Sequence, residues 1–340
     1  MRTGKIVVLG ILLAFALVLN ACNSKKTEEE PEFVFAEDVV FAVNGREVSV
    51  GEWNLYIRPL LDETENIYGT DIWKYTMDAE GKKFGEAMQE YVRDTIVNIK
   101  VVSGYASELG LSLSDEEKIE IRAKAEEYMK ELSESDRTKY GITQELVESV
   151  YSDNYLANEV YEYITLNVDT ETDETEVRHM SLRYIMQPKT YEDREGNTLF
   201  LSDEEIERKR NELEAIRTRV ADNKDISLKD YESDSIVVTD IITDYAGLKE
   251  RLPEDMAGIV FWLRQDEISR VLESDEALFL FECVDVSDEY TTNAARIKVI
   301  EQREQQVFEE AYSKWKEDVE VVYNLSEWNT ITEEMKAYGS

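Results

Sequence analysis

The sequence predicts an α+β protein in which a helical lobe is interrupted by an inserted α+β domain. Three observations lead to this prediction. Apolar residues recur at helical spacing between Glu52 and Ile164, strand-like segments follow an acidic joint at Asn167–Val177, and one long helical segment returns after Thr292. A chain of 340 residues that is 42% hydrophobic has enough apolar material for two cores.

The first 21 residues form a segment of a different kind. Arg2 and Lys5 precede an apolar run from Ile6 to Leu19, and "LNAC" then ends at Cys22. The run is too short for an ordinary spanning helix and indicates an export signal. It resembles a bacterial lipoprotein signal, which implies a lipid on Cys22 and an extracytoplasmic protein anchored to the cell membrane, with residues 22–38 as a charged spacer. The alternative is an uncleaved anchor with an incidental cysteine.

Charge and cysteine content exclude some classes of partner and structure. The chain has 75 acidic and 38 basic residues and a formal net charge of −37, so it repels phosphate backbones and is not expected to bind nucleic acid. Besides Cys22 there is only Cys283, which excludes an internal disulfide framework. Cys283 stands in an apolar strand, where we expect a buried, inert thiol.

The first lobe, residues 39–166, opens with a predicted β-hairpin. Asn44-Gly45 is a dipeptide that tight hairpin turns prefer. Ser49 and Glu52 then stand at capping-box spacing before a helix. Further helices are predicted over about 83–109, 115–132 and 144–164.

The second domain, residues 167–290, combines strands and helices. It is predicted to contain a strand over Val177–Met186, a helix over Asp203–Ala221 and a strand through Leu278–Phe281 with apolar side chains on both faces. Residues 291–340 carry a one-sided helix to about residue 318, a short strand and a terminal turn around Trp328. A one-sided helix needs a partner face, which we expect the first lobe to supply.

Three segments resemble exported foldases of the parvulin class, the PrsA- and SurA-like peptidyl-prolyl isomerases. "FAVNGREVSVGEW" resembles the strand, turn and helix that open the chaperone lobe of this family, and "YASELGLSLSDEE" resembles a helix, glycine stop and recapped helix of the same lobe. Phe261, the loop "DEIS" at Asp266–Ser269 and the strand "ALFLF" resemble the end of a parvulin domain. The resemblance covers most of the chain after the signal and implies a chaperone-like helical lobe with an inserted parvulin-like domain.

The chain departs from the family at the active site. The family has one histidine on the first strand of the domain and another on the last, and here Tyr184 and Phe279 stand at those positions. His179 lies upstream of the first position. In "VVTDIITDY", Asp240 is the match for the acidic position. The resemblance therefore implies a degenerate active site, in which Tyr184 and Asp240 are the remaining catalytic candidates.

Rotation about an Xaa-Pro bond faces a barrier of roughly 20 kcal/mol, set by amide resonance. A catalyst needs an apolar pocket for the proline ring and polar groups that support the twisted amide. Beside Tyr184, the resemblance implies a substrate groove walled by Met186, Met256, Phe261 and Phe279, and ordinary core packing is the alternative for these side chains. Because the polar support is missing, we expect weak or absent isomerase activity with the peptide groove retained.

Other kinds of catalytic site have little material in this sequence. His179 is the single histidine, which disfavours a Ser-His-Asp triad or a histidine-rich metal site. The acidic clusters lack the spacing of a calcium-binding EF-hand, and no glycine-rich phosphate loop is present. The sequence therefore predicts neither a metal nor another cofactor.

The function that the sequence favours is a membrane-anchored extracytoplasmic foldase or chaperone whose partners are unfolded or partly folded exported proteins. One alternative is a solute-binding lipoprotein of a transporter, which should show alternating strand-helix units in two lobes. A purely structural lipoprotein is a further alternative.

Overall fold

A computed structural model describes residues 34–79 and 81–337 of the chain. The expected export signal and Cys22 lie outside the described residues. The chain divides into two compact units, one formed by Met1–Asn167 with Gln305–Ser340 and the other by Val168–Glu304. They are called unit 1 and unit 2. Within the described ranges, no helix is both long enough and apolar enough to cross a membrane.

Unit 1 contains a three-stranded antiparallel sheet of β1 (Val39–Val43), β2 (Arg46–Ser49) and β9 (Val321–Tyr323), in the order β2-β1-β9. Asn44 and Gly45 have φ angles of 49° and 76°, as the predicted tight turn requires. β1 lies between two strands, and all five of its residues are buried. The sheet thus joins the two ends of the described chain within one unit.

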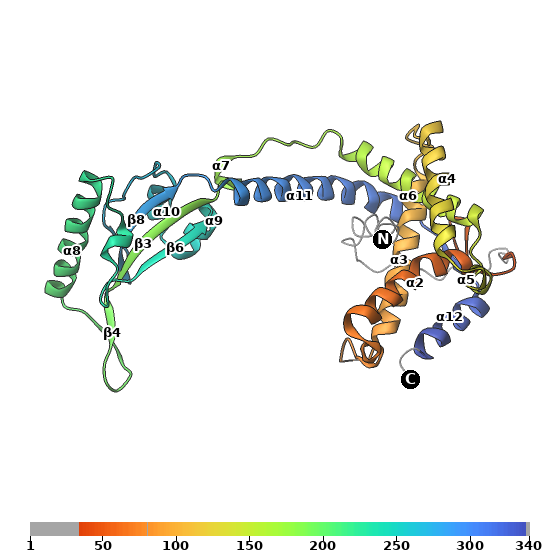
Figure 1. The fold of residues 1–340 in the computed structure, drawn as a ribbon, viewed down its shortest axis with the longest axis horizontal. Coiled ribbons are helices and arrows are strands. Elements are labelled where there is room, and N and C mark those ends of the chain that lie inside the picture. Colours follow the sequence, from red (N-terminus) through yellow and green to blue (C-terminus); the bar gives the residue numbers. More distant parts are fainter. Residues whose placement is uncertain (1–33, 80, 338–340) are drawn as a thin grey trace. The chain divides into compact units, whose positions relative to one another are not determined.

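The helices of unit 1 pack around one apolar core. Figure 1 shows them, and their bounds in chain order are α2 (Val50–Tyr68), η1 (Thr70–Lys74), α3 (Phe84–Gly104), α4 (Asp115–Glu131), α5 (Glu134–Tyr140), α6 (Gln144–Thr165) and, after β9, α12 (Leu325–Ala337). The capping box of Ser114 and Glu117 begins α4 as its sequence suggests. α3 ends earlier than expected, and the expected terminal turn is the helix α12.

The long helix α11 (Glu289–Lys316) ends in unit 1 and finds the partner face that its one-sided pattern requires. Phe308 packs against Tyr161 of α6, with ring centroids 5.1 Å apart. Trp315 stacks on Tyr105, just after α3, with ring centroids 4.5 Å apart. Aromatic contacts between segments far apart in sequence therefore complete the helical lobe from both ends of the chain.

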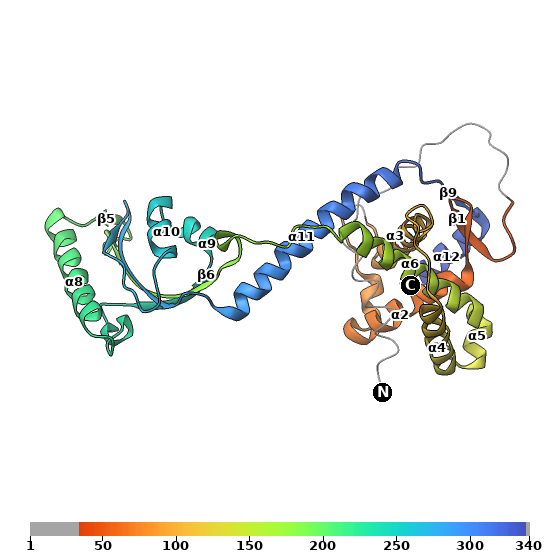
Figure 2. The same ribbon diagram turned by 90° about the horizontal axis from the view of Figure 1, so that it is seen from above.

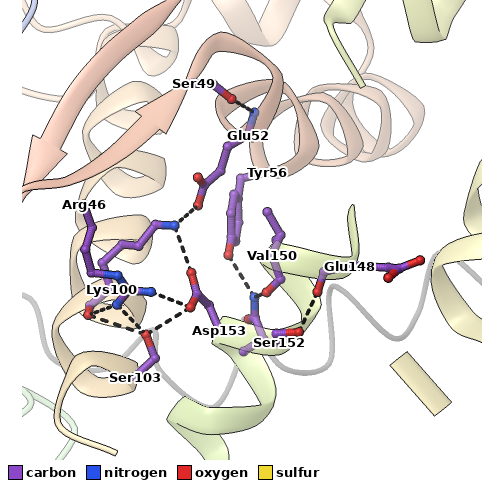
Figure 3. A network of polar contacts seen from close by, with 11 residues as sticks. Arg46, Ser49, Glu52, Tyr56, Lys100, Ser103, Glu148, Val150, Ser152 and Asp153 are labelled. Atoms are coloured by element: carbon purple, nitrogen blue, oxygen red, sulfur yellow. Dashed lines mark hydrogen bonds and ion pairs between the residues drawn. The ribbon is translucent and has the colours of Figure 1, made fainter. Parts of the chain in front are cut away.

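A buried ion-pair network joins the hairpin, α2, α3 and α6 of unit 1 (Figure 3). Lys100 is only 6% exposed and lies between two carboxylates, with Nζ 2.9 Å from Glu52 and 2.8 Å from Asp153. Arg46 reaches the same Asp153 at 2.5 Å and donates to the Ser103 hydroxyl at 2.9 Å. Two positive and two negative charges thus compensate one another, with Lys100 and Glu52 buried and Arg46 at the partly exposed edge of the network.

Glu52 departs from its expected role as half of a capping box. The Ser49 hydroxyl does cap α2 by accepting from the Glu52 backbone N–H at 3.1 Å. The Glu52 carboxylate, however, turns to Lys100. Burial raises the pKa of Glu52 above its ordinary value, and Lys100 partly offsets this effect. The pairing with Lys100 therefore favours the charged form of the buried Glu52 carboxylate.

Unit 2 is built on a four-stranded antiparallel sheet in the order β6-β3-β8-β7. Its strands are β3 (Met180–Pro188), β6 (Val238–Thr243), β7 (Leu272–Glu273) and β8 (Ala277–Asp285). The flanking helices are α7 (Glu174–Val177), α8 (Asp203–Asp222), η2 (Leu228–Tyr231), α9 (Tyr245–Arg251) and α10 (Glu254–Phe261). A separate hairpin pairs β4 (Thr190–Glu192) with β5 (Thr198–Phe200). The α+β class expected from the sequence is confirmed.

The sheet of unit 2 has an apolar layer on each face, as the sequence of β8 indicates. Leu278 and Leu280 join a cluster with Leu213 and Ile216 of α8. Phe279 and its neighbours at alternate positions join a second cluster with α9 and α10. Figure 2 shows α8 on one side of this sheet and α9 and α10 on the other. We call these the α8 face and the α9 face.

This architecture differs from that of the solute-binding alternative. A protein of that class should alternate strands and helices in two lobes. Among the described residues, unit 1 has a helical lobe with one small sheet, and the sheet of unit 2 is antiparallel throughout. The described residues therefore lack the pattern that this alternative predicts.

Replacing Lys100 by Met should lower the free energy of unfolding by about 3–5 kcal/mol, because Glu52 and Asp153 would stay buried without their shared cation. Lys118→Met is the matched control, since it removes the same charge from a largely exposed pair 3.5 Å long with Asp115. The control should change stability by less than about 1 kcal/mol. Urea unfolding followed by far-ultraviolet circular dichroism measures both. Equal losses in the two variants would contradict a supporting role for the network.

Candidate functional site

A cavity of about 590 Å³ lies in unit 2, on the α9 face of the sheet. This volume is in the range of pockets that bind small ligands or single side chains with their flanking backbone. The residues that line it are Tyr184, Met186, Pro188, Thr190, Thr198, Phe200, Ile241, Leu248, Arg251, Leu252, Ser274, Glu276, Ala277, Phe279 and Phe281. They come from β3, β6 and β8, from the end of α9, from the turn before β8 and from the β4–β5 hairpin.

The pleat of the sheet positions the apolar wall of the cavity. Alternate side chains of a strand share one face, so Tyr184 and Met186 of β3 point to the same side. β3 pairs with β8 in a register that places Tyr184 opposite Phe281 and Met186 opposite Phe279. The Tyr184 and Phe281 rings stack with centroids 5.2 Å apart. Phe279 is 9% exposed and Met186 is 47% exposed, so the wall runs from the core to the surface.

The β4–β5 hairpin supplies one side of the cavity, and the sequence analysis missed it. Its Phe200 lines the cavity although this side chain is 77% exposed. The turn is held by Asp193, whose carboxylate accepts the backbone N–H of Asn197 at 2.9 Å. Hydrogen bonds to Asn197 lower the pKa of Asp193. The sequence "DREGN" is typical of a turn and could have predicted this hairpin. Its Gly196 has a φ of 83° in the structure.

Lys189 fastens the base of this hairpin to the turn before β8. Its ammonium group lies 2.6 Å from Glu273 and donates to the carbonyl oxygen of Ser274 at 2.7 Å. The Lys189 backbone N–H donates to the carbonyl oxygen of Glu276 at 2.8 Å. Hydrogen bonds from Lys189 are the main cause of a lowered pKa of Glu273. The two sides of the cavity mouth are therefore joined by both ionic and backbone contacts.

The polar groups that line the cavity are few. Hydroxyls come from Tyr184, Thr190, Thr198 and Ser274, and the charged side chains are Arg251 and Glu276. Ser274 is used by the turn itself, because its hydroxyl oxygen accepts the backbone N–H groups of Glu276 and Ala277. The lining contains no histidine or cysteine. Its apolar surface suits binding, and it offers little of the polar support that amide rotation needs.

Two residues expected to wall the groove lie in the core instead of lining the cavity. Phe261 is fully buried, and its ring packs against Tyr245 with centroids 5.1 Å apart. Met256 is also buried in the cluster on the α9 face. Both belong to α10, which packs on the α9 face of the sheet beside the cavity lining. Of the four expected groove residues, the structure places Met186 and Phe279 in the cavity.

Asp240 and Tyr184 are not brought together, because they lie on opposite faces of the sheet. β6 pairs with β3 so that Asp240 stands opposite Arg183, and the Arg183 Nε lies 2.7 Å from the Asp240 carboxylate. Arg183 also donates to the Ser227 hydroxyl at 3.1 Å on the α8 face. The hydrogen bond to Asp240 raises the pKa of Arg183. Asp240 therefore serves an ion pair on the far side of the sheet from the cavity.

The single histidine has a structural position. The backbone N–H of His179 donates to the hydroxyl of Thr292 at 3.0 Å, and its ring Nδ1 lies 3.0 Å from the carbonyl oxygen of Val177. These contacts hold the start of β3 to the start of α11. His179 does not line the cavity. In the described part of the chain, no group of three or more histidine, cysteine or acidic residues is arranged to hold a metal ion.

Comparisons with known proteins connect this chain to foldases. It is 25% identical over 157 residues to the foldase protein PrsA of Caldanaerobacter subterraneus subsp. tengcongensis, a stretch that is 46% of this chain and 49% of that protein. The chain thus spans about half the length of this curated relative. The sequence likeness confirms the resemblance to PrsA- and SurA-like foldases that the motifs indicate. No family model matches the sequence.

Solved structures of the same kind also resemble the chain. The foldase PrsA of Lactococcus lactis is 11% identical, with a TM-score of 0.28 and coverage of 87% of this chain and 98% of that one. A peptidylprolyl isomerase PrsA of Bacillus cereus is 13% identical, with a TM-score of 0.28 and coverage of 85% and 95%. A SurA-like chaperone of Campylobacter jejuni is 11% identical, with a TM-score of 0.28 and coverage of 84% and 99%.

The Cys283 thiol should be inert in the folded protein. It is fully buried in the apolar cluster on the α9 face, and burial raises its pKa from 9.0 to about 11. The thiolate reacts and the thiol does not, so Ellman's reagent at about pH 8 should label native protein at less than about one hundredth of the rate in urea. Protein that begins at residue 23 carries Cys283 as its single thiol.

The same shift has a defined effect on stability. Because the folded pKa lies above the unfolded one, Cys283 favours the fold fully below about pH 9 and loses this contribution as pH rises through about 11. Cys283→Ala should remove that part of the alkaline decline in the urea midpoint. Rapid labelling of the native thiol would show instead that the α9 face opens readily.

Proposed function

We propose that this chain is an extracytoplasmic foldase that binds unfolded exported proteins at the unit 2 cavity and is tethered to the cell membrane by a lipid on Cys22. The observation that carries the proposal is the partly exposed apolar wall of Met186 and Phe200 over the more buried Phe279. The sequence likeness to a PrsA foldase supports it. The tether rests on the sequence of residues 1–22.

The cavity suits an apolar side chain of an extended segment. An unfolded chain exposes such side chains, and each one transferred from water to an apolar site contributes about 1.5–3 kcal/mol when fully buried. Such binding shields a client from self-association without fixing its sequence. The net charge of −37 adds a repulsion that keeps foldase-bound clients apart and attracts basic clients over longer distances.

Isomerisation is a separate question from binding. The transition state for rotation needs polar groups around the twisted amide. Tyr184 and Phe279, which the resemblance matches to the two histidine positions of parvulins, line the cavity, and Asp240 is on the other face of the sheet. We therefore propose a foldase that acts mainly as a holding chaperone.

Truncating the exposed apolar wall should weaken client binding without unfolding the protein. Met186→Ala and Phe200→Ala should each raise the dissociation constant for unfolded, reduced and carboxymethylated α-lactalbumin by about fivefold, as expected from losing part of one buried side chain. Ile242→Ala is the matched control, because Ile242 is 55% exposed on the α8 face of the same sheet. Light scattering of aggregating exported clients provides a second readout.

The proposal fails if protein that begins at residue 23 neither binds the unfolded probe nor changes the aggregation or refolding yield of several exported clients. Binding that is equal in Met186→Ala, Phe200→Ala and Ile242→Ala would keep a chaperone role but move it away from the cavity.

Isomerase activity should be near background. With short Xaa-Pro peptides in a protease-coupled assay, we expect the cis-to-trans rate to match the uncatalysed rate, because the cavity lining has no histidine and Asp240 is not part of it. Tyr184→Phe should then change nothing. A rate clearly above background that falls in Tyr184→Phe and not in Asp240→Asn would instead show an isomerase floor rebuilt around the Tyr184 hydroxyl.

A further inference from the structure

The cavity lining contains one basic side chain, Arg251, in the last turn of α9. Arg251 is exposed, and in the described part of the chain its guanidinium makes no hydrogen bond or ion pair. It does not pair with Glu276, the one carboxylate of the lining. A guanidinium with this freedom can present two parallel N–H donors to an incoming carboxylate.

The neighbouring cations are already engaged, which distinguishes Arg251 from them. Lys189 at the cavity mouth pairs with Glu273 at 2.6 Å, and Arg210 pairs with the same carboxylate. Lys249, on the same helix as Arg251, lies over the ring of Tyr245, 4.9 Å from its centroid. Among the described residues that line the cavity, the positive charge available to a ligand is therefore that of Arg251.

On the basis of the proposed function, we propose that the cavity selects client segments in which a large apolar residue has a carboxylate on one side of it in the sequence. The apolar side chain occupies the wall of Met186, Phe200 and Phe279, and the carboxylate pairs with Arg251. Residues of an extended segment advance by about 3.3 Å each, so an acidic side chain near the apolar one stays within reach of the cavity lining. The negative charge of Glu276 in the same lining repels a carboxylate on the other side of the apolar residue. The cavity would therefore distinguish a segment with the acidic residue before the apolar one from a segment with it after.

This selectivity is compatible with a strongly acidic protein. At physiological ionic strength, charges more than about 8 Å apart in water are largely screened. The net charge of −37 therefore acts mainly on the approach of a client. A direct guanidinium–carboxylate contact in a partly enclosed cavity is screened much less. Basic clients are thus attracted over longer distances, whereas the final contact in the cavity favours a segment with a carboxylate.

The test compares fluorescein-labelled peptides of about nine residues by fluorescence anisotropy, with protein that begins at residue 23. Each peptide has a central leucine in a serine-glycine background. One has glutamate before the leucine, one has it after, and two further peptides carry glutamine at those places. We expect one glutamate peptide to bind about three- to tenfold more tightly than its glutamine counterpart.

Variants assign the preference to Arg251. Arg251→Gln should abolish it, Arg251→Glu should invert it, and Arg251→Lys should retain part of it. Arg219→Gln is the matched control, because Arg219 is an exposed arginine on α8, away from the cavity, and this variant should keep the full preference.

The outcomes separate this inference from the proposed function. If all four peptides bind equally and Met186→Ala weakens them all, the cavity binds apolar segments and the role of Arg251 is refuted. If none of the peptides binds and unfolded clients are not protected either, both proposals fail. A preference for glutamate that survives in Arg251→Gln would assign the recognition to another cation and overturn the inference.

Discussion

The register of β3 between β6 and β8 determines what unit 2 can do. Because strand side chains alternate between faces, one register places Tyr184 and Met186 on the α9 face and Arg183 on the α8 face. The cavity wall and the ion pair of Arg183 with Asp240 follow from this choice. A slip by one residue would bury Arg183 among phenylalanines and expose the cavity wall to α8. Both apolar layers oppose such a slip, so the site is held by the core itself.

Unit 1 depends on a different constraint, the compensation of buried charge around Lys100. The four charged side chains come from β2, α2, α3 and α6, so no single element can move without leaving a charge unpaired. Such a network adds little net stability over an apolar core, but breaking one of its pairs leaves a buried charge without a partner. We infer that this cost favours one packing of the helices. Its members are satisfied by one another and lie in a helical core. We therefore interpret the network as a structural feature that holds the elements of unit 1 together, and not as a ligand-binding site.

Local signals in the sequence predicted most of the fold. The prediction of the site was limited because it depends on which strands pair, and in which register, between segments far apart in sequence. Asn44-Gly45, the Ser114 capping box and the two-sided pattern of β8 each depend on neighbours in sequence, and each is present. The β4–β5 hairpin was missed because its three-residue strands are largely exposed and carry no hydrophobic periodicity. Asp240 was a candidate because it is near the right segment, but the pairing of β6 with β3 decides which face it occupies. Spacing alone could not separate Met186 in the cavity from Phe261 in the core.

The composition of the cavity separates binding from catalysis on physical grounds. Holding a client needs apolar area that stays the same while the amide rotates, and such uniform binding leaves the barrier unchanged. Lowering the barrier needs groups that interact more strongly with the twisted amide than with the planar one. The lining has much apolar area for holding a client, in Met186, Phe200 and Phe279, and few groups that could favour the twisted amide. Under the proposal for Arg251, the exposed guanidinium of the lining would discriminate between clients without lowering the rotation barrier. The lining of unit 2 thus suits the proposed holding of apolar segments better than the rotation of their proline bonds.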